Sequence, residues 1–172
     1  MNWWKKFIQT QYEYHFGLEL SNLRAEVLVL KALKEEEIEK PIETGKVSIF
    51  EALVLFKQAF PDAEIYLSDP SYTLTSVSEA SRFLKQDTLN LKKFEQDVYD
   101  CDNFSKALWG YWQNWQSELA LGILWITKPY SHALNVAILT DENGNKGVYV
   151  IEPQNDKIYE VPKDYIGRLI VM

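Results

Sequence analysis

The sequence predicts an α+β fold in a single domain, residues 1–172, in which a mainly helical part, residues 1–95, packs on a helix and an antiparallel sheet formed by residues 96–172. Two observations predict this division. Apolar residues recur at helical spacing in the first part, whereas strand-like apolar runs dominate the second. No linker rich in Pro, Gly or Ser separates the two parts, so we expect them to fold as one unit.

The first part carries several helix patterns and one short strand pattern. Two pairs, Ser48 with Glu51 and Ser76 with Glu79, are typical capping boxes and predict that a helix begins at each. Residues 64–67 lie between these helices and predict a short strand. An earlier helix is indicated by apolar residues at spacings of three and four, namely Leu23, Val27, Leu30 and Leu33.

The second part begins with a helix over residues 101–115, whose apolar side chains share one face. Runs typical of β-strands follow it. These runs are 119–127, 132–140, 146–152, 157–161 and 165–171. The segment Asp141–Asn145 is a strong turn sequence, so the second and third of these strands should form a hairpin. A helix followed by an antiparallel meander completes the predicted arrangement.

Composition excludes several classes of function. A net charge of −7 argues against nucleic-acid binding, which depends on positive charge. The longest apolar run, 119–126, is too short to span a bilayer, and the first residues have no apolar segment typical of a secretion signal. The single cysteine excludes an intrachain disulfide and is compatible with the cytoplasm, so we expect a cytoplasmic location or assign none.

Three residues in the second part carry the types of side chain needed for thiol chemistry. Cys101 lies at the start of the predicted helix, His132 begins a strand, and Glu152 ends the next strand of the hairpin. These are the parts of a nucleophile, its base and the group that orients the base. Each also has a structural interpretation, because a lone cysteine is often a small buried apolar residue and a Glu before Pro often only ends a strand. In one hairpin register His132 and Glu152 are diagonal neighbours on one face of the sheet.

The carboxylates around Cys101 oppose this chemistry. Asp97, Asp100 and Asp102 lie close to it in sequence, and negative charge disfavours a thiolate. Protonated His132 could offset that charge, and so could a hard cation such as Ca²⁺, which prefers carboxylate and amide oxygens. Capping of the helix by Asp100 is the simpler alternative.

Three short segments resemble a known family: Asp100–Phe104, His132–Ala133 and Glu152–Gln154. They resemble papain-like cysteine hydrolases of the compact order, the transglutaminase-like and NlpC-type enzymes. The closer likeness is to the calcium-dependent cysteine protease domain at the C-terminus of the fairy-ring mushroom agglutinin. The resemblance covers roughly the last 75 residues, and it implies a papain-like fold.

The resemblance also implies roles for individual residues. Cys101 would be the nucleophile, His132 the base and Glu152 its orienting group. Asp102 and Gln154 would be calcium ligands. An oxyanion would be held by the side-chain amide of Gln96 or by the backbone N–H of Cys101.

The leading functional expectation is therefore a papain-like cysteine hydrolase, a peptidase or amidase that acts on a peptide or amide substrate. Ca²⁺ is its expected metal, and no organic cofactor is expected. A protein partner could dock on the helical first part. The alternative is a non-enzymatic binding or structural module on a degenerate papain-like fold.

Overall fold

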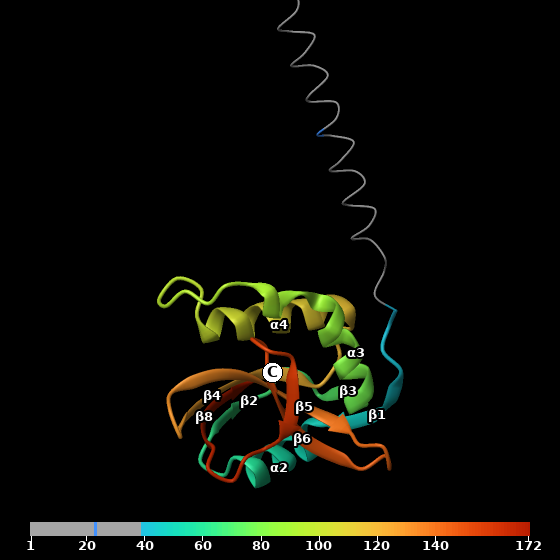
Figure 1. The fold of residues 1–172 in the computed structure, drawn as a ribbon. Coiled ribbons are helices and arrows are strands. Elements are labelled where there is room, and N and C mark those ends of the chain that lie inside the picture. Colours follow the sequence, from blue (N-terminus) through green and yellow to red (C-terminus); the bar gives the residue numbers. More distant parts are fainter. Residues whose placement is uncertain (1–22, 24–38) are drawn as a thin grey trace, which may run out of the picture. The chain divides into compact units, whose positions relative to one another are not determined.

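A computed structural model describes Leu23 and residues 39–172, and residues 40–172 form one unit (Figure 1). Leu23 is helical and about half exposed. The rest of the helix predicted from Leu23 to Leu33 lies outside the described residues.

The described unit contains two sheets, three α-helices and one short 3-10 helix. Its first elements are β1 (Glu43–Ser48), α2 (Ile49–Ala59), β2 (Glu64–Tyr66), β3 (Ser71–Thr75), α3 (Val77–Asp87) and η1 (Leu89–Leu91). Its later elements are α4 (Cys101–Trp115), β4 (Leu121–Lys128), β5 (His132–Thr140), β6 (Lys146–Glu152), β7 (Lys157–Glu160) and β8 (Ile166–Val171).

The larger sheet has six strands in the order β2-β8-β4-β5-β6-β7. Strands β4 to β7 form the predicted antiparallel meander, and the turn after Asp141 joins β5 to β6. Strand β8 instead pairs with the other edge of β4, and β2 pairs with β8 in parallel. The sheet therefore contains both antiparallel and parallel pairs. Its parallel pair joins β2 and β8, which are far apart in the sequence.

The predicted fold class is wrong. In the described part of residues 1–95, strands β1, β2 and β3 stand beside α2 and α3, so this part is not mainly helical and does not simply pack on a separate antiparallel sheet. Strands dominate the described unit. β1 escaped prediction because it pairs only with β3, in a separate two-stranded sheet, and its side chains apart from Val47 are exposed, so it has no apolar alternation to recognise.

Local capping signals were predicted correctly. The Ser48 hydroxyl accepts a hydrogen bond from the backbone N–H of Glu51, and Ser76 does the same for Glu79, each over 3.2 Å. Each bond satisfies one of the N–H groups that a helix start leaves unpaired. Helix α4 begins and ends where the sequence predicted, at Cys101 and Trp115.

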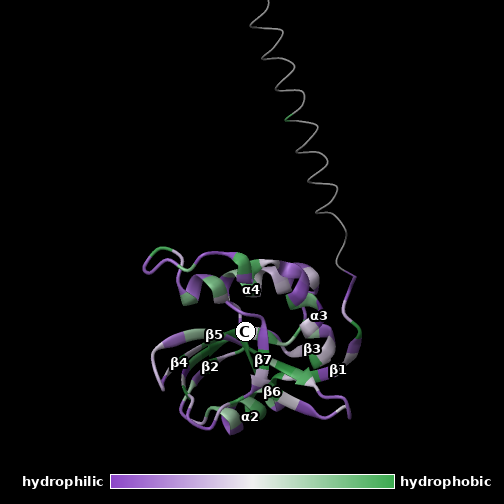
Figure 2. Ribbon diagram, in the orientation of Figure 1, coloured by the Kyte–Doolittle hydropathy of each residue, from purple (hydrophilic) through white to green (hydrophobic). Residues whose placement is uncertain are grey.

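The large sheet separates two apolar clusters (Figures 1 and 2). Helix α2 covers one face, where Leu134 and Val136 of β5 are fully buried. Helices α3 and α4 cover the other face, where Ala137 and Leu139 of the same strand pack. Successive side chains of a strand point to opposite faces of the sheet, so a strand that is buried on both faces contributes to both clusters. The sheet thereby fixes the ends of β5, β6 and β8, which position the candidate site.

No helix in the described residues is long and apolar enough to cross a membrane.

Candidate functional site

Cys101 is the first residue of α4 and is partly buried. Its backbone carbonyl accepts a hydrogen bond from the Ser105 hydroxyl over 3.0 Å. A second hydrogen bond stabilises the start of the helix: the side-chain oxygen of Asn103 accepts the backbone N–H of Asp100 over 3.2 Å. Within the described residues no hydrogen bond joins the Cys101 thiol to His132, so the contact between them stays a prediction.

The carboxylates beside Cys101 compensate one another. A hydrogen bond with Asp102 raises the pKa of Asp100, so Asp100 retains a proton more readily than an ordinary aspartate. The hydrogen bonds that Asp100 and Lys106 make to Asp102 hold the pKa of Asp102 low. Lys106 also forms an ion pair with Asp102 one helical turn away. The negative charge of Asp102 is thus offset by Lys106, and Asp100 and Asp102 share a hydrogen bond.

This pairing bears on the predicted calcium site. The carboxylate of Asp102 is committed to Lys106 and Asp100, and among the described residues no group of three or more His, Cys, Asp or Glu side chains could hold a metal ion. Gln154 lies just after β6, and its backbone N–H donates to Glu152. Calcium binding at Asp102 and Gln154 stays a prediction.

His132 and Glu152 form the strongest polar contact of the candidate site. The Nε2 atom of His132 lies 2.8 Å from Oε2 of Glu152, and both side chains are largely buried. The other oxygen of Glu152 accepts the backbone N–H of Gln154 over 3.2 Å. Since Asn135 pairs with Ile151, His132 and Glu152 are diagonal neighbours on β5 and β6. The sequence predicted this contact, and the structure confirms it.

Gln96 occupies a different setting. It lies in a turn closed by backbone hydrogen bonds between Glu95 and Tyr99, and it is exposed at that turn. The structure shows no hydrogen bond from its side chain to the described residues around Cys101. Its role as an oxyanion donor stays a prediction.

Three tyrosines extend the site beyond the predicted residues. The ring of Tyr130 lies 5.6 Å from the ring of His132. The hydroxyl groups of Tyr159 and Tyr165 lie 3.3 Å apart. Burial raises the pKa of Tyr159, and burial followed by the neighbouring Tyr165 raises the pKa of Tyr130, so these two tyrosines stay neutral at ordinary pH.

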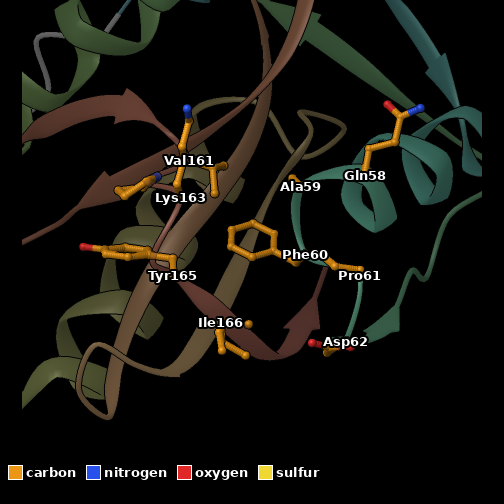
Figure 3. A pocket seen from close by; sticks show the side chains of 11 residues that line it. Gln58, Ala59, Phe60, Pro61, Asp62, Val161, Lys163, Tyr165 and Ile166 are labelled. Atoms are coloured by element: carbon orange, nitrogen blue, oxygen red, sulfur yellow. The ribbon is translucent and has the colours of Figure 1, made fainter.

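Tyr165 also lines a cavity between the end of α2 and the segment from β7 to β8 (Figure 3). The cavity has a volume of about 430 Å³, within the range of ligand pockets. Sequence reasoning missed it, because its two walls are distant in sequence. Only the Phe60-Pro61 pair could have indicated it in the sequence, because the proline predicts that the helix ends next to an aromatic side chain.

No protein-family model and no curated protein matches this chain. Two solved structures share its fold. The first, described as a complex of PSL1a with E64, has a TM-score of 0.66 at 22% identity and aligns with 74% of this chain and 50% of its own. The second is the Polyporus squamosus lectin bound to a human-type influenza-binding epitope, Neu5Acα2-6Galβ1-4GlcNAc, with a TM-score of 0.59, 25% identity and coverage of 70% and 46%.

This chain thus spans about half the length of the structures it matches. The second is described as a lectin with a bound glycan, and neither description names a cysteine protease. The predicted membership of a cysteine protease family, the hydrolase activity and the peptide substrate are therefore wrong. The comparisons favour the alternative, a non-enzymatic binding module. The failure came from short motifs, because a few residues around Cys101 and Glu152 were taken to specify a reaction.

Proposed function

We propose that this chain is a non-enzymatic binding module whose ligand is a carbohydrate. The observation that carries the proposal is the shared fold with a lectin that was solved with a sialylated trisaccharide. Because the match spans only about half of that lectin, the argument also needs a suitable surface on this chain.

Such a surface lies around the start of β5, β7 and the start of β8. It combines Tyr130, Tyr159 and Tyr165 with the polar pair His132 and Glu152. A sugar ring has an apolar face of C–H groups and a rim of hydroxyls. Tyrosine matches both, because its ring is apolar and its hydroxyl forms hydrogen bonds. The pair of His132 and Glu152 then acts as a fixed polar border, since each side chain holds the other.

The thiol of Cys101 has no part in this proposal. It lies at the start of α4, where the acidic side chains around it are paired among themselves. In this interpretation Cys101 is a small, partly buried residue of the helix start, which is the commonest role of a lone cysteine.

Calorimetric titration of the full chain tests the proposal, with Neu5Acα2-6Galβ1-4GlcNAc and Galβ1-4GlcNAc as probes and sucrose as a control sugar. We expect saturable binding of at least one probe and an unchanged affinity in a Cys101→Ser variant. A glycan array without any bound sugar would overturn the carbohydrate proposal. Hydrolysis of a peptide or amide that disappears in Cys101→Ser would overturn its non-enzymatic part.

A further inference from the structure

We infer that the sugar ring sits in the cavity between α2 and the segment from β7 to β8, which adjoins the tyrosine surface at Tyr165, and that this ring is a neutral pyranose rather than an anionic sugar. This inference rests on the proposed function and adds the place and the class of ligand. The cavity walls are Gln58–Asp62 on one side and 161–167 on the other (Figure 3).

The floor of the cavity is apolar and closely packed. Phe60 is only 1% exposed, and its ring lies directly on the backbone of Gly167. A Cβ atom added at Gly167 would lie 2.9 Å from Cδ1 of Phe60, which is closer than such atoms can approach. The floor therefore keeps its shape without a ligand, and a pre-formed floor lowers the entropic cost of binding.

One wall of the cavity is an aromatic ring held in place. Tyr165 is partly buried, and its hydroxyl lies 3.3 Å from that of Tyr159. The rings of these two tyrosines are nearly perpendicular, with centroids 6.5 Å apart. Tyr165 can thus offer its apolar face to a sugar ring while Tyr159 limits its rotation.

The opposite wall is rich in hydrogen-bond acceptors. Helix α2 ends there, and the last carbonyls of a helix have no partner within it. Pro61 has no N–H to offer them, and the N–H of Ala63 is bonded to the carbonyl of Phe60. Asp62 adds a carboxylate to the same wall. A hydroxyl-bearing ligand can donate to the carboxylate of Asp62 and to those last carbonyls of α2 that these hydrogen bonds leave free.

The same wall disfavours an anionic ligand. The C-terminal end of a helix carries partial negative charge, and Asp62 adds a full one. Lys57, the basic residue in the last turn of α2, is occupied, because its Nζ atom donates to the carbonyls of Pro61 and Ala63. Lys163 is the one cation and Asp62 the one anion among the residues that line the cavity, so the lining carries no net positive charge. A neutral hexose therefore fits better than a sugar carboxylate.

Titration of the full chain with Galβ1-4GlcNAc and with Neu5Acα2-6Galβ1-4GlcNAc tests this. We expect the neutral disaccharide to bind at least as tightly as the sialylated trisaccharide. Tyr165→Ala should weaken that binding by about tenfold or more, because an aromatic contact of about 1.4 kcal/mol is lost. Tyr165→Phe keeps the ring and should lose much less.

The matched control is Tyr111→Ala, which removes an exposed tyrosine from α4, on the other side of the sheet from α2. Thermal melts show whether each variant is folded. If a glycan binds and Tyr165→Ala binds it with unchanged affinity, the cavity is not the site, although the proposed function stands. If no glycan binds the unaltered chain, both proposals fail. Tighter, Tyr165-dependent binding of the sialylated probe would overturn the preference for a neutral ring.

Discussion

The Nε2 atom of His132 and the Oε2 atom of Glu152 lie 2.8 Å apart across two neighbouring strands, although the residues are twenty positions apart in the sequence. Both side chains are largely buried, and Glu152 also accepts the N–H of Gln154. The pair therefore ties the start of β5 to the turn after β6. Four predictions about stability follow from this and other contacts.

Glu152→Ala should lower the free energy of unfolding by about 1–3 kcal/mol, because it leaves His132 and the N–H of Gln154 without their acceptor. Urea denaturation measures the change. Glu160→Ala, at an exposed position on β7, is the control and should change stability by less than about 0.5 kcal/mol. Equal effects of the two substitutions would show that the pair adds nothing to stability.

Asp87 should make the protein more stable at mildly acidic pH than at neutral pH. Burial raises the pKa of Asp87 to about 6, and the charge of Asp156 adds to the effect. Between the ordinary value of 3.8 and about 6, the folded state binds a proton that the unfolded state has lost. Stability from this group is therefore full below pH 4 and declines as pH rises through 6.

Asp87→Asn should flatten that part of the pH dependence, because the amide does not ionise. Thermal melts of the two proteins between pH 4 and pH 7 make the comparison. One oxygen of Asp87 is buried without a partner, whereas the other accepts the N–H of Leu89. The Asn variant keeps an oxygen for Leu89. Parallel melting curves across this range would show that Asp87 has an ordinary pKa.

Gly167→Ala should destabilise the fold by about 1–3 kcal/mol, because its methyl group would overlap the ring of Phe60. Gly110→Ala is the matched control. Gly110 lies within α4 and has open space where a Cβ would be placed, so this substitution should stabilise the helix by about 0.5–1 kcal/mol. Denaturant midpoints of the two variants should move in opposite directions, and movement in the same direction would contradict the packing described at Phe60.

Ser76→Ala should cost about 1 kcal/mol, because the backbone N–H of Glu79 loses its cap at the start of α3. Ser76→Asp keeps an oxygen in the capping position and should retain most of the stability. Guanidinium denaturation measures both. If Ser76→Asp is as unstable as Ser76→Ala, the hydroxyl has another role in the bend between β3 and α3.

Local signals made the second half of the fold predictable. Helix α4 was predicted with its observed bounds, and the later strands were predicted to within about two residues, because alternation and the turn after Asp141 are contained in short windows of sequence. The parallel pairing of β2 with β8 was not predictable in this way. It depends on which edge of β4 is free, and that is a property of the assembled sheet.

In the candidate site, too, contacts within one short segment of sequence could be predicted and contacts between distant segments could not. The contact between His132 and Glu152 followed from one hairpin register and could be predicted. The cavity at Phe60 and Gly167 joins segments that meet only through the sheet, so no window of sequence contains it. The predicted activity failed for another reason, since residue types at plausible positions do not determine which ligand a fold serves.

Strand β8 lies inside the sheet, between β2 and β4, although it is formed by residues 166–171. During synthesis on the ribosome, β2 and the exposed edge of β4 must wait for this strand before either can pair with it. We therefore expect the nascent chain to expose these strand edges until β8 has been synthesised, and the sheet to close only then, in one cooperative step.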